Sequence, residues 1–268
     1  MKTILCPTDF SDVSENAISY AAQFAQQIGA SLHLTHLHLL SDMAEERVTV
    51  GTVLNNDQLT ELLKKRSVDV GKTYQISCNA EAVVQSRGLA TSIAQQAGDF
   101  DYLVMGSNGE DNIFQRLAGS TTYRVVKKAG VPVIIVPPQC KYRNIRQILY
   151  AFDYWRVIDV PMEKIVSFAK ELKSSLRVVQ VMEAYSLDAE QELRATEAVL
   201  MDTYSEGIDL SFKTLYDERV SHALREYMLK GNFDLLAFYY KEDSTALMHT
   251  RVIREMTRDT WYPIFVFH

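Results

Sequence analysis

Several features that would assign a protein to a class at once are scarce in this chain of 268 residues. It has 3 cysteines, Cys6, Cys78 and Cys140, which lie far apart without CxxC spacing, so neither a disulfide framework nor a zinc site is predicted. A net charge of -6 gives no electrostatic basis for binding nucleic acid. No apolar stretch approaches the roughly 20 residues that span a bilayer. The remaining composition, 47% hydrophobic and 23% charged, is that of a globular protein.

Targeting signals and the commonest nucleotide motifs are also missing. The start, MKTILCPTDF, has one lysine and a short apolar run before Pro7 and Asp9, which is unlike a signal peptide. We therefore expect a cytoplasmic protein with no membrane or nucleic-acid partner. No GxxxxGKS or GxxxxGKT occurs, and no GxGxxG follows the first apolar run, which excludes a P-loop and a Rossmann NAD site.

The chain contains an internal repeat. Three pairs of segments match in the same order: TILCPTDFS (3–11) with QILYAFDYW (147–155), DYLVMG (101–106) with DLLAFY (234–239), and VPVIIV (131–136) with YPIFVF (262–267). The sequence therefore predicts two similar tandem domains, residues 1–139 and residues 143–268. Between them Pro137 and Pro138 end a strand, because proline lacks the N–H that a strand ladder needs.

Apolar runs alternate with amphipathic stretches along the first copy. The runs predict strands at 3–8, 31–40, 76–84, 101–106 and 131–136, and the amphipathic stretches predict helices at 14–29, 56–71, 89–98 and 121–130. In the first helix we expect Ser14 as N-cap and Gly29 just past the end. Nearly continuous apolar strands separated by helices are typical of a parallel sheet covered on both faces. Each copy is therefore predicted to be a five-stranded, doubly wound α/β domain.

Glycine is scarce, at 11 residues, yet MGSNGEDNIFQRLAGST (105–121) holds three of them, Gly106, Gly109 and Gly119. Ligands of such sheets bind beyond the carboxyl ends of the strands, where the strand order reverses. If the first and fourth strands are neighbours there, Pro7-Thr8-Asp9 and Gly106 meet at one place. Glycine lets backbone amides approach a phosphate, and Gly119-Ser120 would supply free N–H groups at the start of a helix. The alternative is a strand–loop–helix connection whose glycines serve turn geometry alone.

The pattern G-x2-G-x9-G-S after an apolar strand, together with PTDFS after the first strand, resembles the ATP-binding universal stress proteins. The resemblance covers residues 3–136 and implies the adenine nucleotide alpha-hydrolase-like fold. It also implies ATP, or AMP or ADP, as ligand, with Mg²⁺ or Mn²⁺ held through the phosphates.

The resemblance implies roles for individual residues. Asp9 would accept a hydrogen bond from ribose, Leu37 would lie against adenine, and the glycine loop would surround the phosphates. The full set of implied contacts is Pro7, Thr8, Asp9, Leu37, Met105, Gly106, Asn108, Gly109, Gly119, Ser120 and Thr121. Asn108 stands where some members carry a basic residue.

The second copy lacks this pattern. Tyr239 stands in place of Gly106 and Glu242 in place of Gly109, and no Gly-Ser pair opens the following helix. Tyrosine would block close approach of the backbone, and Glu242 with Asp243 would repel phosphate. Only Asp153 is kept from the first turn, so the second domain is predicted to be degenerate and to hold no ATP.

Family members pair through their last strands, and here both last strands are apolar edge candidates in one chain. We therefore expect an internal pseudo-dimer of the two domains, and leave a homodimer of whole chains open.

His36 and His38 share one face of a strand but lack ligand-like partners, so we expect polar residues at a strand end and no metal site.

Three functions fit this sequence. The first is a nucleotide-sensing regulatory module of the stress response. The second is a slow ATP hydrolase or phosphate-transfer enzyme. The loop has no obvious base or catalytic lysine, which argues against this function, and we therefore predict no catalytic residue. The third is a ligand-free interaction scaffold. The intact glycine loop of the first copy argues against this function.

Overall fold

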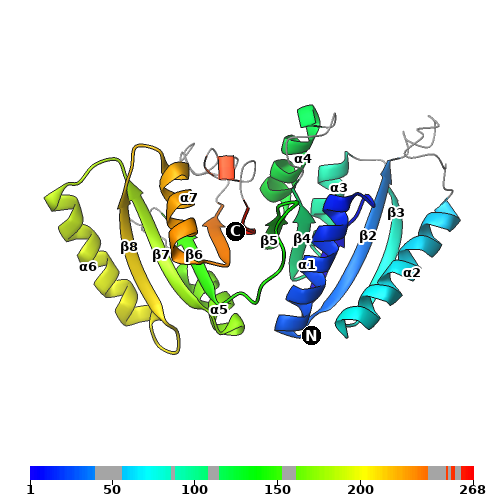
Figure 1. Ribbon diagram of the computed structural model, residues 1–268, viewed down its shortest axis with the longest axis horizontal. Coiled ribbons are helices and arrows are strands. Elements are labelled where there is room, and N and C mark those ends of the chain that lie inside the picture. The colour runs from blue at the N-terminus through cyan, green and yellow to red at the C-terminus, as the bar shows by residue number, and fades with distance from the viewer. Residues whose placement is uncertain are drawn as a thin grey trace. The chain divides into compact units, whose positions relative to one another are not determined.

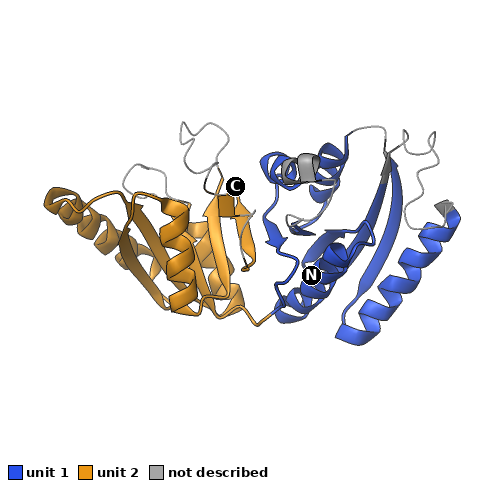
Figure 2. Cartoon of the chain, turned by 45° about the horizontal axis from the view of Figure 1, so that its top comes forward, with its two compact units in different colours: residues 1–142, 268 blue, residues 143–267 orange. Residues whose placement is uncertain are grey.

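The computed structural model describes residues 1–39, 56–85, 88–107, 115–152, 161–240, 252, 255–256 and 261–268. It divides into two compact units, residues 1–142 with His268 and residues 143–267 (Figure 2). We refer to them as unit 1 and unit 2. Within the described residues, no helix is both long and apolar enough to cross a lipid bilayer.

Unit 1 alternates strands and helices as the sequence predicts. Its elements are β1 Thr3–Pro7, α1 Asp12–Ile28, β2 Ser31–Leu39, α2 Asn56–Tyr74, β3 Cys78–Gln85, α3 Leu89–Ala97, β4 Tyr102–Gly106, α4 Gln115–Lys128 and β5 Val133–Val136. The helix α1 contacts α2, and α3 contacts α4, so two helical layers enclose the strands (Figure 1). This agrees with the buried residues that run through β1, β4 and β5.

The strand order of unit 1 is β3-β2-β1-β4-β5, and every described pair is parallel. The predicted α/β, doubly wound fold is confirmed. The order reverses between β1 and β4, which pair through Ile4 with Tyr102 and Leu5 with Leu103. The chain segments that follow β1 and β4 therefore leave the same edge of the sheet side by side, as the sequence predicts for a switch point.

The helix α1 connects this edge to the core. Its buried face is built from small and apolar residues at helical spacing, which lets the helix lie close to β1 and β4: Ala17, Ile18, Ala21, Ala22, Phe24 and Ala25. It ends at Gly29, whose φ of 66° is the left-handed C-cap conformation that glycine adopts at no steric cost. The predicted N-cap Ser14 is wrong, because Ser11 caps the helix and its Oγ accepts from the Ser14 N–H at 3.2 Å.

Unit 2 repeats the topology of unit 1. Its elements are β6 Gln147–Ala151, α5 Met162–Leu172, β7 Ser175–Met182, α6 Leu187–Tyr204, β8 Leu210–Tyr216, α7 Val220–Gly231, β9 Leu235–Tyr239 and β10 Ile264–Phe267. The parallel order β10-β9-β6-β7-β8 is that of unit 1, with β6 in the place of β1 and β9 in the place of β4.

Individual backbone hydrogen bonds recur at the offsets of the sequence repeat. The Thr8 N–H donates to the Thr35 carbonyl at 2.8 Å, and the Phe152 N–H donates to the Val179 carbonyl at 3.0 Å. Likewise Ser107 donates to Val136 and Tyr240 to Phe267, at 2.9 and 2.8 Å. The two units therefore share a backbone frame at the carboxyl edge of the sheet, and their difference there lies in the side chains.

The segment that leaves β5 is bound to α1. The buried Asn16 amide donates to the carbonyls of Pro137 and Cys140 at 3.1 and 2.9 Å, and its Oδ1 accepts from Lys141 Nζ at 3.0 Å. The Tyr142 ring packs edge-on against Tyr20, with centroids 4.9 Å apart. Residues 137–142 therefore pack as part of unit 1.

Candidate functional site

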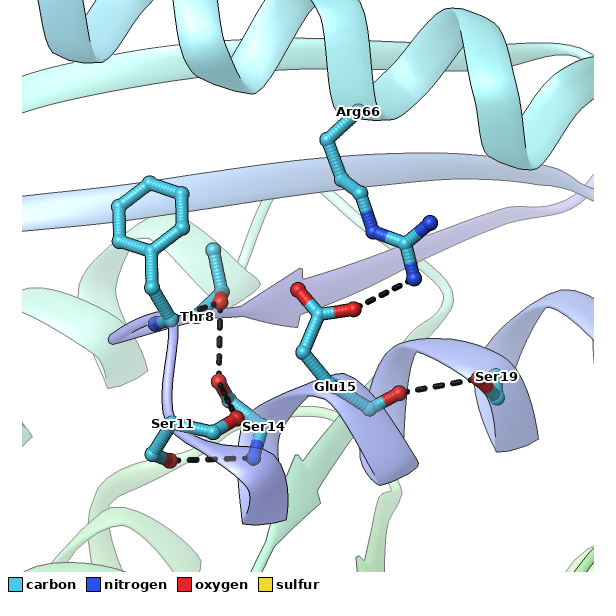
Figure 3. Close-up of polar contacts among 7 residues, drawn as sticks. Thr8, Ser11, Ser14, Glu15, Ser19 and Arg66 are labelled. Atoms are coloured by element: carbon cyan, nitrogen blue, oxygen red, sulfur yellow. Dashed lines mark hydrogen bonds and ion pairs between the residues drawn. The ribbon is translucent and has the colours of Figure 1, made fainter.

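Thr8 follows β1 at the switch point, and each of its polar atoms has a partner inside unit 1. Its N–H donates to β2 through the Thr35 carbonyl, and its own carbonyl accepts from His36 Nδ1 at 2.7 Å. Its hydroxyl oxygen accepts from the Phe10 N–H at 3.0 Å and lies 3.0 Å from Ser14 Oγ (Figure 3). Thr8 is buried, and contacts with β2, with the first turn of α1 and with Phe10 of its own turn fix its position. Its hydroxyl group is engaged with the protein itself.

Asp9 lies on the exposed side of the same turn. Its Oδ1 accepts from the Ser11 N–H at 3.0 Å and from the Ser11 hydroxyl at 2.5 Å. Partial desolvation by the surrounding chain would by itself raise the pKa of Asp9, but these hydrogen bonds from Ser11 and a further one from Ser14 outweigh it and hold the pKa below its ordinary range. Asp9 therefore presents a carboxylate in one orientation at neutral pH.

Phe10 and His36 complete the turn. Phe10 has a φ of 63°, a left-handed conformation that is strained for a bulky residue, and its ring lies 5.0 Å from the His36 ring. Burial lowers the pKa of His36, against the opposing effects of the Thr8 carbonyl and Asp9. The imidazole is therefore neutral at pH 7, and its N–H must be on Nδ1, because Nδ1 faces a carbonyl oxygen.

Gly106 ends β4 beside this turn, and the first turn of α1 packs directly against it. A Cβ at this position would lie 2.7 Å from Val13 Cγ1 and 3.1 Å from the Val13 carbonyl oxygen. The glycine therefore allows α1 to approach β4 closely. Its neighbour Ser107 is buried and donates its N–H to the Val136 carbonyl.

The structure brings several predicted residues to one edge of the sheet. Pro7 pairs with Thr35 of β2, two residues before Leu37, and Gly106 pairs with Val136 of β5 directly after Met105. Asn108 and Gly109 lie outside the described residues, so their predicted role stays a prediction.

One expectation about the glycine loop is wrong. Gly119 and Ser120 do not open a helix, because α4 begins four residues earlier, at Gln115. The segment QRLA ahead of Gly119 consists of strong helix formers, which extend the helix toward the loop. Free N–H groups at a helix start therefore belong to residues near Gln115, one turn before Gly119. The side chains of Ser120 and Thr121 lie outside the described part of the chain.

A metal pair at His36 and His38 has no support in the parts of the chain that are described. There, no group of three or more histidine, cysteine, aspartate or glutamate side chains could hold an ion. His36 instead binds the Thr8 carbonyl.

Sequence reasoning missed Ser11, Ser14 and His36 as parts of the turn. For Ser11 the signal was available, since an Asp-x-Ser before a helix is a common capping arrangement. For His36 it was not, because the contact joins residues 28 apart in the chain.

The capped carboxylate makes a pH-dependent contribution to stability that can be measured. Since the folded pKa of Asp9 is lowered, its contribution is present above the unfolded pKa and disappears as the pH falls through the folded pKa. We expect Asp9→Asn to unfold at lower urea concentration than wild type at pH 7. Its free energy of unfolding should be lower by less than about 1 kcal/mol, because the side chain is exposed. The two proteins should converge in acid. A difference that persists unchanged at low pH would contradict this assignment.

The corresponding edge of unit 2 is filled by aromatic rings. Tyr150 lies 5.3 Å from Phe152 and 5.6 Å from Phe267, and Tyr239 lies 5.6 Å from Phe267. By the repeat offsets these four residues replace Cys6, Thr8, Val136 and Gly106 of unit 1. The shared backbone frame therefore carries smaller side chains in unit 1 and a cluster of aromatic rings in unit 2, of which Tyr150 and Phe152 are stacked.

Comparison with known proteins gives a family match. Residues 1–137 match the model of the universal stress protein family. The universal stress protein MJ0577 of Methanocaldococcus jannaschii is 28% identical over 152 residues, which cover 50% of this chain and 94% of that protein. The universal stress protein Slr1230 of Synechocystis is 25% identical over 175 residues, 57% of this chain, and the match spans only 60% of that protein's length.

The solved structure of a universal stress protein from Archaeoglobus fulgidus resembles both units. The likeness has a TM-score of 0.72 at 18% identity and covers 99% of this chain and 96% of that one. At this identity the likeness is one of fold.

Proposed function

Because this chain belongs to the universal stress protein family, we propose that unit 1 binds ATP and acts as a nucleotide-sensing module of the stress response. One observation carries the proposal. A rigid turn that presents the Asp9 carboxylate leaves the sheet next to Gly106, where the glycine loop begins, at the point where the strand order reverses. This is the position at which doubly wound sheets bind ligands.

The chemistry of the turn suits a nucleoside. A carboxylate held in one orientation and ionised at neutral pH is a strong acceptor for ribose hydroxyl groups. Leu37 lies on β2, two residues after Thr35, the residue that pairs with Pro7, and it offers an apolar contact for adenine. Asn108, Gly109, Gly119, Ser120 and Thr121 are proposed for the phosphates, and a divalent ion would be held by those phosphates. Thr8 acts through its backbone and through the turn, since its hydroxyl is engaged with Phe10 and Ser14.

A binding role fits this geometry better than catalysis. Among the described residues near the turn, His36 is neutral and its Nδ1–H donates to the Thr8 carbonyl, a contact that holds the turn. A sensing module needs only that ATP binds reversibly and stabilises the turn and α1.

We expect wild-type protein, stripped of nucleotide, to bind ATP in a calorimetric titration, and Asp9→Ala to weaken binding roughly 10- to 100-fold. The estimate follows from the loss of a charged hydrogen-bond acceptor, about 1.5–3 kcal/mol. Mass spectrometry of the nucleotide released by denaturing the purified protein identifies the ligand without assuming it.

Asp12→Ala is the matched control, because Asp12 is an exposed carboxylate only three residues away in the first turn of α1. It should leave the ATP affinity within about twofold of wild type. No ATP binding by wild type, or equal losses in both variants, would overturn the proposal. A turnover assay on the same samples separates binding from slow hydrolysis.

A further inference from the structure

We propose that His36 is a positioning residue for nucleotide binding: its Nδ1–H bond to the Thr8 carbonyl holds the turn that aims Asp9. The inference rests on the proposed function and adds to it a residue that lies outside the predicted contact set. His36 lies on β2, whereas Asp9 follows β1, so the contact ties the ligand-facing turn to a neighbouring strand.

The first argument is how the turn is held. Both backbone polar groups of Thr8 are bound to β2: its N–H donates to the Thr35 carbonyl at 2.8 Å, and its carbonyl accepts from His36 Nδ1 at 2.7 Å. Two residues later, Phe10 adopts a φ of 63°, which costs energy for a residue with a Cβ. A strained residue persists only where its surroundings hold it. Phe10 is held by the hydrogen bond from its N–H to the Thr8 hydroxyl and by the contact of its ring with the His36 ring.

The second argument is the chemistry of the imidazole. A neutral histidine has one N–H, and the Thr8 carbonyl fixes it on Nδ1. Burial lowers the pKa of His36, although the carbonyl and the Asp9 carboxylate would favour the charged form. The side chain therefore acts as a constant donor at neutral pH, which is what a positioning role requires.

The third argument is the comparison with unit 2. There the same backbone bond joins Phe152 to Val179, but the residue that corresponds to His36 is Gln180, and the residue that corresponds to Thr8 is Phe152. The hydroxyl and the imidazole are replaced together, in the unit whose sheet edge is filled by aromatic rings. The pair is thus kept only where a nucleotide is proposed to bind.

Two substitutions separate the hydrogen bond from the packing of the ring. His36→Asn keeps an amide N–H near the place of Nδ1, whereas His36→Leu keeps apolar volume and removes the donor. We expect His36→Leu to raise the ATP dissociation constant roughly tenfold, and His36→Asn to stay within about threefold of wild type, because one hydrogen bond to a buried carbonyl is lost only in the first. Calorimetric titration with ATP measures both, after circular dichroism has shown that each variant is folded.

His33 provides the matched control. It is a half-buried histidine on the same strand, three residues away, and its ring lies against Phe100 rather than against the turn. His33→Leu should leave ATP affinity unchanged. NMR of the imidazole nitrogens in the nucleotide-free protein should show His36 as the Nδ1–H tautomer, a readout independent of ATP.

The outcomes are distinct. Unchanged affinity in folded His36→Leu would overturn the positioning role while leaving the proposed function intact. Equal losses in the leucine and asparagine variants would assign the effect to ring packing and would also overturn it. If wild type binds no ATP, the proposed function fails and the positioning role of His36 in nucleotide binding fails with it, whatever tautomer the NMR spectrum shows.

Discussion

Replacing Gly106 by valine is expected to destabilise unit 1 strongly. Even a Cβ there would lie 2.7 Å from Val13 Cγ1 and 3.1 Å from the Val13 carbonyl oxygen. The side-chain atom can rotate away, but the carbonyl belongs to the first turn of α1 and moves only if the helix moves. For Gly106→Ala we expect a loss of about 1–3 kcal/mol, as for other overpacked sites, and a larger loss for valine, whose branches meet α1 directly.

The loss of stability in unit 1 can be measured with unit 2 of the same chain as the reference. Its 2 tryptophans, Trp155 and Trp261, both belong to unit 2, so tryptophan fluorescence reports that unit while far-UV circular dichroism reports both. In urea the Gly106 variants should lose circular dichroism early while fluorescence changes near the wild-type midpoint. Gly130→Ala is the control, because a Cβ at Gly130 meets nothing within 4 Å, and it should be neutral within about 0.5 kcal/mol. Full stability of Gly106→Val would show that α1 does not depend on this close approach.

ATP is expected to saturate the protein at one molecule per chain. The two units share the backbone bonds at the sheet edge, yet Phe152 stands for Thr8 and Tyr239 for Gly106, and their rings pack with Tyr150 and Phe267. Aromatic side chains occupy the edge where unit 1 offers a glycine and an oriented carboxylate. Glu242 and Asp243 follow in the sequence and would repel phosphate.

Stoichiometry from calorimetry of nucleotide-stripped protein tests this asymmetry directly. Asp9→Ala should weaken the single site, whereas Asp153→Ala, at the corresponding position of unit 2, should change the affinity by less than about twofold. Tyr239→Gly should not create a second site, because Phe152 still replaces Thr8. Two equivalent sites, or loss of binding in Asp153→Ala alone, would reverse the assignment of the units.

The sequence was sufficient for the fold because its strongest signals are local and repeated. Apolar runs such as VPVIIV and the glycine at position 29 mark a strand and a helix end by themselves, and the repeat supplied each inference twice. The meeting of the segments after β1 and β4 followed from the general rule for doubly wound sheets.

The details of the site needed the structure because several residues compete for each role. In TDFSDVSEN, six side chains are of cap-forming types, and the structure assigns the cap of α1 to Ser11 rather than to Ser14. The start of α4 was placed too late because glycine suggested a break where the surrounding helix formers prevail. Thr8 was identified from the resemblance as a ligand contact, and only the distances to Phe10, Ser14 and His36 show that its polar atoms serve the turn.

The packing of residues 137–142 on α1 bears on how the chain can be divided for experiments. A fragment that ends at residue 139 would remove Cys140, whose carbonyl accepts from the Asn16 amide, and Tyr142, whose ring covers Tyr20. The truncated protein would then expose an aromatic ring and a buried amide that the intact chain satisfies, and its behaviour would reflect the cut. The first position that spares α1 is after Tyr142, so the natural unit of expression is longer than the sequence repeat itself.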